Sequence, residues 1–223
     1  MNTSKQTFRS YVKLVLDVLK IERFFDFKYR LFDIFPKRFV SPPFSEFLFT
    51  IQGHGTECPV TKVCTHFHKS YEWFSGYWSD CTAKYLIFIS LETGILLGIV
   101  GPYFGPESDS SCARDSRICE FLDTNKEFGI GDGKFSGLNR LKVKGNFYGE
   151  KRKEFQTKRP LVENVIGYFK HFQIFNSPFR HSKEEHVDWF NSIGNFVFYQ
   201  TFYFPHKWYP KDIKKEDFVL TNY

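Results

Sequence analysis

Two apolar runs in the middle of the chain, at 84–90 and 95–100, are rich in β-branched and aromatic residues. The connection between them, residues 91–94 (LETG), is short and ends in glycine. Runs of this composition on either side of a short turn predict an antiparallel β-hairpin. We therefore expect a hairpin at the centre of the fold.

Two shorter runs, at 47–52 and 127–130, also have the composition of strands. Each is followed by a glycine-flanked residue, in the sequences GHG at 53–55 and GDG at 131–133. Because glycine clusters interrupt regular structure, we expect both strands to end there. Residues 56–80 are polar and are expected to be irregular.

Apolar residues recur with the period of an α-helix in four other segments. These predict an amphipathic helix at 9–19, a helix with a less regular apolar face at 109–123, and two later helices at 162–172 and 183–200. Segment 134–160 lacks this period and is predicted to be a loop.

The predicted order of elements is strand, insertion, hairpin, helix, strand, loop and two helices. Mixed elements of these lengths indicate an α/β or α+β domain, with helices packed on one sheet. Prolines at 36, 42 and 43 interrupt the chain before the first strand. We expect a helical leader at 1–45, one folded domain at 46–205 and a C-terminal tail at 206–223.

The composition predicts a folded protein in a reducing compartment. Hydrophobic residues make up 42% of the 223 positions and charged residues 25%, which favours a packed core over disorder. The five cysteines form no CxxC pair, and their odd number argues against a secreted disulfide framework. No signal peptide or membrane-spanning stretch is recognisable, so we expect a soluble, intracellular protein without a membrane partner.

The net charge of +6 is unevenly distributed along the sequence. Segment 134–160 carries nine Lys and Arg against two Glu, a net charge of +7, so the rest of the chain is close to neutral. Such a segment is either a solvated loop or a surface that follows phosphates. The candidate nucleic-acid-binding residues are Lys142, Lys144, Lys151, Arg152, Lys153, Lys158 and Arg159.

Three acids hold positions from which they could bind a metal ion. Asp109 opens a predicted helix, Asp132 follows a predicted strand, and Glu163 lies in the first turn of a helix. Carboxylates from neighbouring elements can converge at the end of a sheet and hold a hard divalent cation. Each acid also has a structural explanation: Asp109 as an N-cap, Asp132 as a turn residue and Glu163 as a partner of the helix dipole.

A second cluster, Cys58, Cys64, His66 and His68, raises the possibility of zinc. Its C-x5-C-x-H-x-H spacing does not match structural zinc sites, in which ligand pairs are two to four residues apart. Reduced, partly buried cysteines in an insertion are the preferred interpretation.

Several short motifs, in one order, cover about residues 47–200 and resemble a known family. They are FSG at 74–76 with TAKY at 82–85, GPESDSSCARDS at 105–116, GDGKF at 131–135, RPLVENVIGYFK at 159–170 and FRHS at 179–182. Together they are similar to the Harbinger-type transposases of the DDE superfamily endonucleases. Two departures, Pro106 where the family has Ser and Lys134 where it has Gly, are compatible with the same fold.

The resemblance implies an RNase H-like mixed sheet flanked by helices, with acids that hold divalent ions, Mg²⁺ or Mn²⁺, for phosphodiester cleavage. By this resemblance Asp132 and Glu163 are catalytic metal ligands, and Asp109 is an additional ligand. The resemblance also implies DNA as the substrate and the nucleus, or additionally the cytoplasm, as the location. Because the leader is too short for a helix-turn-helix, sequence choice would need a separate DNA-binding partner protein.

The most important departure concerns the first acid of the family, which lies in a D-G-T-E motif. This chain has His54-Gly55-Thr56-Glu57 at that place, so an imidazole replaces the carboxylate. Neutral imidazole suits Mn²⁺ or Zn²⁺ better than Mg²⁺. Two interpretations follow: a nuclease impaired by His54, or a catalytically silent DNA- or protein-binding module derived from a transposase.

Overall fold

The computed structural model describes residues 48–61, 70–91, 94–122 and 127–203, together with six residues before them, Ser10, Leu14, Val15, Asp17, Val18 and Phe25. The first five of these six are helical and exposed. They belong to the predicted helix 9–19, most of which lies outside the described residues. The C-terminal tail also lies outside them. Phe25 is buried and packs against α6 (Lys183–Tyr203) in the main core, so this residue of the predicted leader is part of the folded unit.

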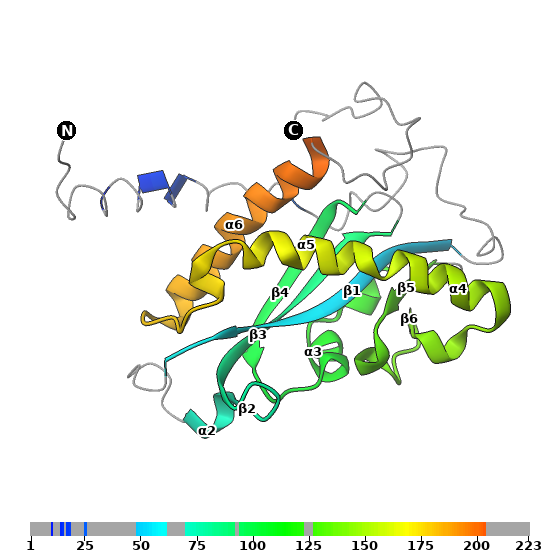
Figure 1. The fold of residues 1–223 in the computed structure, drawn as a ribbon, viewed down its shortest axis with the longest axis horizontal. Coiled ribbons are helices and arrows are strands. Elements are labelled where there is room, and N and C mark those ends of the chain that lie inside the picture. The colour runs from blue at the N-terminus through cyan, green and yellow to red at the C-terminus, as the bar shows by residue number, and fades with distance from the viewer. Residues whose placement is uncertain are drawn as a thin grey trace.

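A mixed sheet forms the centre of the molecule (Figure 1). Its strands are β1 (Leu48–Pro59), β2 (Phe74–Ser75), β3 (Asp80–Ser90), β4 (Leu96–Phe104), β5 (Glu127–Gly131) and β6 (Leu141–Lys142). They follow the order β2-β3-β1-β5-β6, and β4 also pairs with β3. The pairs β1–β3 and β3–β4 are antiparallel, whereas β1–β5 and β5–β6 are parallel. The predicted central hairpin, β3–β4, is confirmed.

Helices cover both faces of this sheet (Figure 1). They are α2 (Ser70–Trp73), α3 (Asp109–Asp115), α4 (Gly149–Lys158), α5 (Pro160–Lys170) and α6, with short 3-10 turns η2 (Ile118–Phe121), η3 (Gly133–Phe135), η4 (Lys144–Asn146) and η5 (Gln173–Phe175). The arrangement is an α/β fold with an RNase H-like mixed sheet, as predicted. The described helices include none with the length and apolar character needed to cross a bilayer.

Strand β3 shows why the sheet is covered on both sides. Successive side chains of a strand point to opposite faces, and the continuous apolar run of β3 supplies a core to each. Tyr85, Ile87 and Ile89 pack with α5 and α6 on one face. Leu86 and Phe88 pack with α3 on the other.

The structure differs from the predicted elements in strand β1, which continues through Gly53-His54-Gly55 to Pro59. Both glycines are paired with β3, Gly53 with Phe88 and Gly55 with Leu86. They are needed for close approach rather than for a turn: a Cβ at Gly53 would lie 2.6 Å from the Phe88 ring. The expectation that this cluster ends the strand was therefore wrong.

Two helical segments also differ from expectation. The predicted helix 109–123 ends at Asp115, and Arg117 adopts a left-handed backbone conformation with φ of 56° before η2 begins. The predicted basic loop contains helix α4, whose one buried side chain, Phe155, packs with Leu91, Ile130 and Phe147. With a single apolar anchor, α4 has no periodic pattern, although Glu, Lys, Arg and Gln favour helices.

Candidate metal centre

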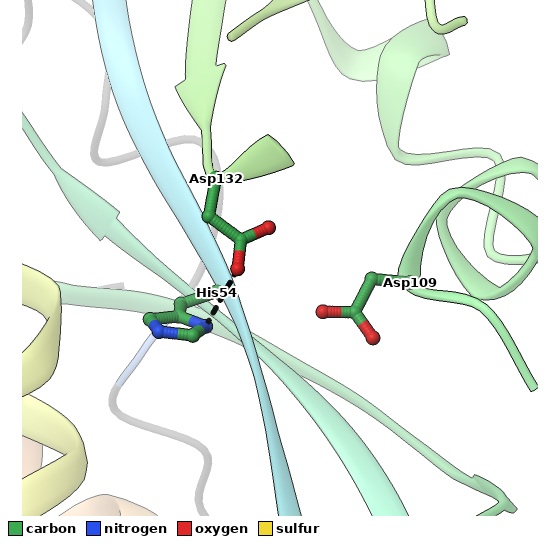
Figure 2. Close-up of side chains that lie close together, drawn as sticks. All are labelled: His54, Asp109 and Asp132. Carbon is green, nitrogen blue, oxygen red and sulfur yellow. Dashed lines mark ion pairs between the residues drawn. The ribbon is translucent and has the colours of Figure 1, made fainter. Parts of the chain in front are cut away.

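Three side chains from three different elements meet beside strand β1 (Figure 2). They are His54 on β1, Asp109 at the start of α3 and Asp132 immediately after β5. His54 Nδ1 lies 3.9 Å from Asp132 Oδ2. One nitrogen or oxygen atom of each residue lies within 4.8 Å of those of the other two.

The sheet topology explains why His54 and Asp132 meet. Parallel pairing of β1 with β5 stops at Gly53 and Gly131, so each of the two residues is the next one along its strand. Asp132 then leaves the sheet as the N-cap of η3, where its Oδ1 accepts a hydrogen bond of 2.9 Å from the Lys134 backbone N–H. This bond holds the carboxylate so that Oδ2 faces His54 (Figure 2). His54 on β1 and Asp132 at the end of β5 therefore lie side by side.

Asp109 reaches the same place from α3, which packs on the face of the sheet opposite to α5 and α6. It is not the N-cap of α3, because the Ser108 side chain takes that role by accepting from the Ser111 backbone N–H. The Asp109 carboxylate instead points toward β1 and is 1% exposed. Gly55 makes room for it: a Cβ at that position would lie 2.2 Å from Asp109 Oδ2. The glycine next to His54 thus permits the carboxylate to approach.

A buried lysine partly balances this negative charge. Lys84 Nζ lies 3.3 Å from Asp109 Oδ1 and 3.7 Å from Glu57 Oε1. It also donates to the Glu107 backbone carbonyl. Glu57 accepts a second contact, 2.6 Å from the Thr82 hydroxyl, so it is committed to this network and does not replace the missing acid at position 54.

The buried polar atoms fit a divalent cation. Neither carboxylate oxygen of Asp109 accepts a hydrogen bond, although Oδ1 pairs with the Lys84 ammonium, and His54 Nδ1 has no hydrogen-bond partner either. Leaving a buried carboxylate oxygen or imidazole nitrogen without a hydrogen bond costs free energy, and a cation at this point would be contacted by both side chains. Two carboxylates and one imidazole form a donor set suited to Mn²⁺ or Zn²⁺.

The neighbouring thiol is not part of this donor set. Burial, reinforced by the Glu107 carboxylate, raises the pKa of Cys112 to about 12. Its sulfur is not among the donor atoms that gather at this point.

Glu163 lies outside this group of three. It is on α5, 45% exposed, and its Oε1 accepts from Arg159 Nε at 3.0 Å. The helix nevertheless starts beside the site, because Gln52 Nε2, two residues before His54, donates to the Arg159 carbonyl at 3.1 Å. The role of Glu163 as a ligand remains a prediction.

The candidate DNA-binding residues lie on β6, η4, α4 and the junction with α5. Arg152, Lys153 and Arg159 are exposed, whereas Lys142 is half-buried with its ammonium 4.9 Å from the Phe128 ring centroid. Because the α4–α5 junction contacts β1 through Gln52, the basic segment reaches the side of the sheet that carries His54.

Two features of the centre escaped the sequence interpretation. Lys84 opens the apolar run 84–90, and a lysine in such a run indicates a buried partner. The glycine cluster at 53–55 predicts the end of a strand, whereas the contact of Gly55 with Asp109 depends on tertiary packing alone. Of the cysteines and histidines considered for zinc, residues 64–68 lie outside the described residues. Cys58 is buried, and burial raises the pKa of its thiol to about 11.

Comparison with known proteins gives one match. A family model described as DDE superfamily endonuclease matches residues 54–193, which is more than half of the chain and begins at His54. Neither the curated proteins nor the solved structures contain a match.

Proposed function

The chain belongs to the DDE superfamily endonucleases, and from this premise we propose that it is a transposase-derived nuclease domain whose metal ion is held by His54, Asp109 and Asp132. The observation that carries the proposal is the meeting of these three side chains, with unpartnered buried atoms, next to the end of β5. The substrate is DNA, and the activity is reduced because an imidazole replaces one carboxylate.

The bound cation would supply charge stabilisation to a phosphodiester and lower the pKa of an attacking water. The side chains hold the place for it. Asp109 and Asp132 provide two negative charges, and Asp132 is fixed by its bond to the Lys134 backbone. His54 contributes a neutral nitrogen, so the site attracts Mg²⁺ less strongly than three carboxylates would and favours Mn²⁺.

Glu163 is proposed to complete the catalytic centre. It lies one helical turn beyond Arg159, on the helix whose start contacts β1 beside His54. An exposed ion pair such as Glu163–Arg159 is worth little, so the carboxylate can turn away from Arg159 at small cost. The basic segment would hold the DNA phosphates, a separate partner protein would select the target sequence, and the nucleus is the proposed location.

A second function is favoured by one specific contact. Lys84 Nζ lies 3.3 Å from Asp109 Oδ1, so a fixed positive charge already neutralises part of the carboxylate that a cation would need. Together with His54, this supports a catalytically silent DNA-binding module derived from the same family. The two functions differ in whether the site binds a cation at all.

The test replaces His54 with Asp and measures metal binding by isothermal titration calorimetry, with plasmid nicking as a second readout. A carboxylate at this position adds a unit negative charge next to the cation, so we expect Mg²⁺ affinity to rise on the order of tenfold or more. Nicking should increase in parallel.

Two further variants separate the ligands. Adding Asp132→Asn to His54→Asp should abolish the gain in Mg²⁺ affinity, because both side chains serve the same ion. Adding Glu163→Gln should remove the gain in nicking. A folded His54→Asp chain that gains neither Mg²⁺ affinity nor nicking would place position 54 outside the metal site. A wild-type chain that binds neither Mn²⁺ nor Mg²⁺ in the same titration would leave the silent module as the function.

A further inference from the structure

The turn between β2 and β3, residues 76–79, carries two exposed aromatic side chains, one of which is contacted by Lys134, two residues after Asp132. Tyr77 is 83% exposed and Trp78 is 49% exposed. Their rings contact each other edge to face, with centroids 5.9 Å apart. Lys134 Nζ lies 5.6 Å from the Tyr77 ring centroid.

Lys134 connects this turn to Asp132. Its backbone N–H donates to Asp132 Oδ1, while its side chain reaches the ring of Tyr77. The aromatic pair and a ligand of the metal centre are thus joined through one residue. Lys134 also stands where the family resemblance predicts glycine, so this connection belongs to the present chain in particular.

The residues that lead into this turn are anchored in the core, whereas the side chains at its tip are exposed. Trp73, just before β2, is 5% exposed and packs against Phe104 with ring centroids 4.7 Å apart. Strand β2 then pairs with the start of β3. The aromatic side chains at the tip therefore project from an anchored base.

From this geometry we propose that Tyr77, Trp78 and Lys134 form a stacking platform for an unpaired nucleobase of the DNA strand bound at the metal centre. Exposed aromatic faces stack on bases of any sequence, and a neighbouring cation attracts both the ring and a phosphate. Two aromatic side chains on one turn and a neighbouring lysine fit one base, whereas a stable protein interface buries about 800 Å² on each partner. The proposal rests on the DNA substrate proposed above.

The test measures binding of fluorescein-labelled oligonucleotides in EDTA, so that cleavage does not contribute. Single-stranded DNA containing 2-aminopurine is compared with a blunt duplex of the same length. Tyr77→Ala combined with Trp78→Ala should weaken single-strand binding roughly fivefold to 100-fold, as expected for the loss of one stacked base. It should also abolish the change in 2-aminopurine emission, while duplex affinity stays within about twofold because phosphate contacts are kept.

Matched variants show whether the loss is specific. Phe196→Ala removes a similarly exposed aromatic, 50% exposed on α6, and should leave all affinities unchanged. Tyr77→Phe combined with Trp78→Phe keeps both ring faces and should retain most single-strand binding. Lys134→Gly should weaken single-strand binding by less than the double alanine variant does.

Three results would overturn the proposal, and they can be told apart. Unchanged single-strand affinity and 2-aminopurine emission in the double alanine variant would reject the platform while the DNA substrate stands. A concentration-dependent dimer of the wild type, lost in that variant by analytical ultracentrifugation, would assign the turn to a second copy of the chain. Absence of any DNA binding by the wild type would remove the proposed function together with the platform.

Discussion

At position 54 an imidazole faces Asp132 in a site whose two carboxylates suit a cation. Asp109 is buried without a hydrogen bond, and Asp132 is held by a backbone N–H so that one oxygen stays directed at His54. Lys84 opposes this arrangement by placing a positive charge beside Asp109. The balance between these residues decides whether the centre binds a cation, and it depends on how closely Asp109 can approach β1.

Gly55 provides a direct test of that approach. A Cβ at position 55 would lie 2.6 Å from Asp109 Cγ, so Gly55→Ala should push the carboxylate away from His54 and Asp132. We expect Mn²⁺ affinity, measured by the electron paramagnetic resonance of free Mn²⁺, to fall on the order of tenfold to 100-fold, as for other residues that orient metal ligands.

The control is Gly133→Ala, which adds the same methyl group beside Asp132. A Cβ at Gly133 would meet no atom within 4 Å, so Mn²⁺ affinity should be unchanged. If a folded Gly55→Ala chain bound Mn²⁺ as tightly as the wild type, Asp109 would not be a ligand.

At the scale of elements, the packing of α6 on β3 depends on a buried histidine. The Tyr85 hydroxyl and His186 Nδ1 are 2.6 Å apart, and the Tyr85 ring stacks on Phe190 with centroids 3.8 Å apart. Burial, with a smaller contribution from the Lys170 charge, lowers the pKa of His186 from 6.5 to about 4. Helix α6 therefore packs on β3 through the neutral imidazole of its own residue His186.

This histidine should make stability depend on pH. Its contribution is fully present above pH 6.5 and is lost as the pH falls through 6.5 toward about 4, because the unfolded chain binds the proton first. The shift predicts a decrease of about 3 kcal/mol in the free energy of unfolding over this range. Urea denaturation at several pH values measures it.

Carboxylates titrate in the same pH range, so the pH dependence of the free energy of unfolding is compared between variants and the wild type. His186→Gln should flatten the pH dependence, whereas His181→Gln, which changes an exposed histidine paired with Glu185, should leave it as in the wild type. Parallel pH profiles of the wild type and His186→Gln would show that the pKa of His186 is the same in the folded and unfolded chain.

The elements that the sequence predicts correctly are those with enough apolar residues to show a period. The hairpin β3–β4, strand β5 and helices α5 and α6 are of this kind. Helix α4 has one buried residue, Phe155, and the second half of β1 contains two glycines whose role is close packing. Both therefore carry little local signal, and their structure is imposed by tertiary contacts.

The candidate site divides in the same way. That His54 and Asp132 would meet was predictable, because each follows the last paired residue of two parallel neighbouring strands. The contacts of Lys84 with Asp109 and Glu57 join β3, α3 and β1, which are distant in sequence. No local pattern encodes such a contact, and the orientation of Glu163 toward Arg159 likewise follows from the folded helix.

Over the whole molecule, positive charge is concentrated on one part of the fold. Segment 134–160 carries a net charge of +7, which exceeds the net charge of +6 of the whole chain. The segment extends from η3, beside Asp132, through β6 and η4 to the end of α4. A concentration of this kind attracts polyanions and orients them as they approach. Because the segment starts two residues after Asp132 and returns to β1 through Arg159 and Gln52, DNA held along it would pass the candidate site.

The salt dependence of binding tests whether this surface contacts phosphates. Replacing Lys151, Arg152 and Lys153 on α4 with alanine should weaken binding to duplex DNA of any sequence. Each phosphate contact contributes about 0.9 to the slope of log affinity against log salt concentration, so three lost contacts should reduce the slope by roughly 2 to 3. Fluorescence anisotropy between low and physiological salt measures the slope.

The control replaces Arg114, Arg117 and Arg180, which are exposed outside the segment, with alanine. This removes the same charge and should reduce the slope by less than about 1. Equal slopes for the α4 variant and the wild type would mean that these three side chains face solvent in the complex.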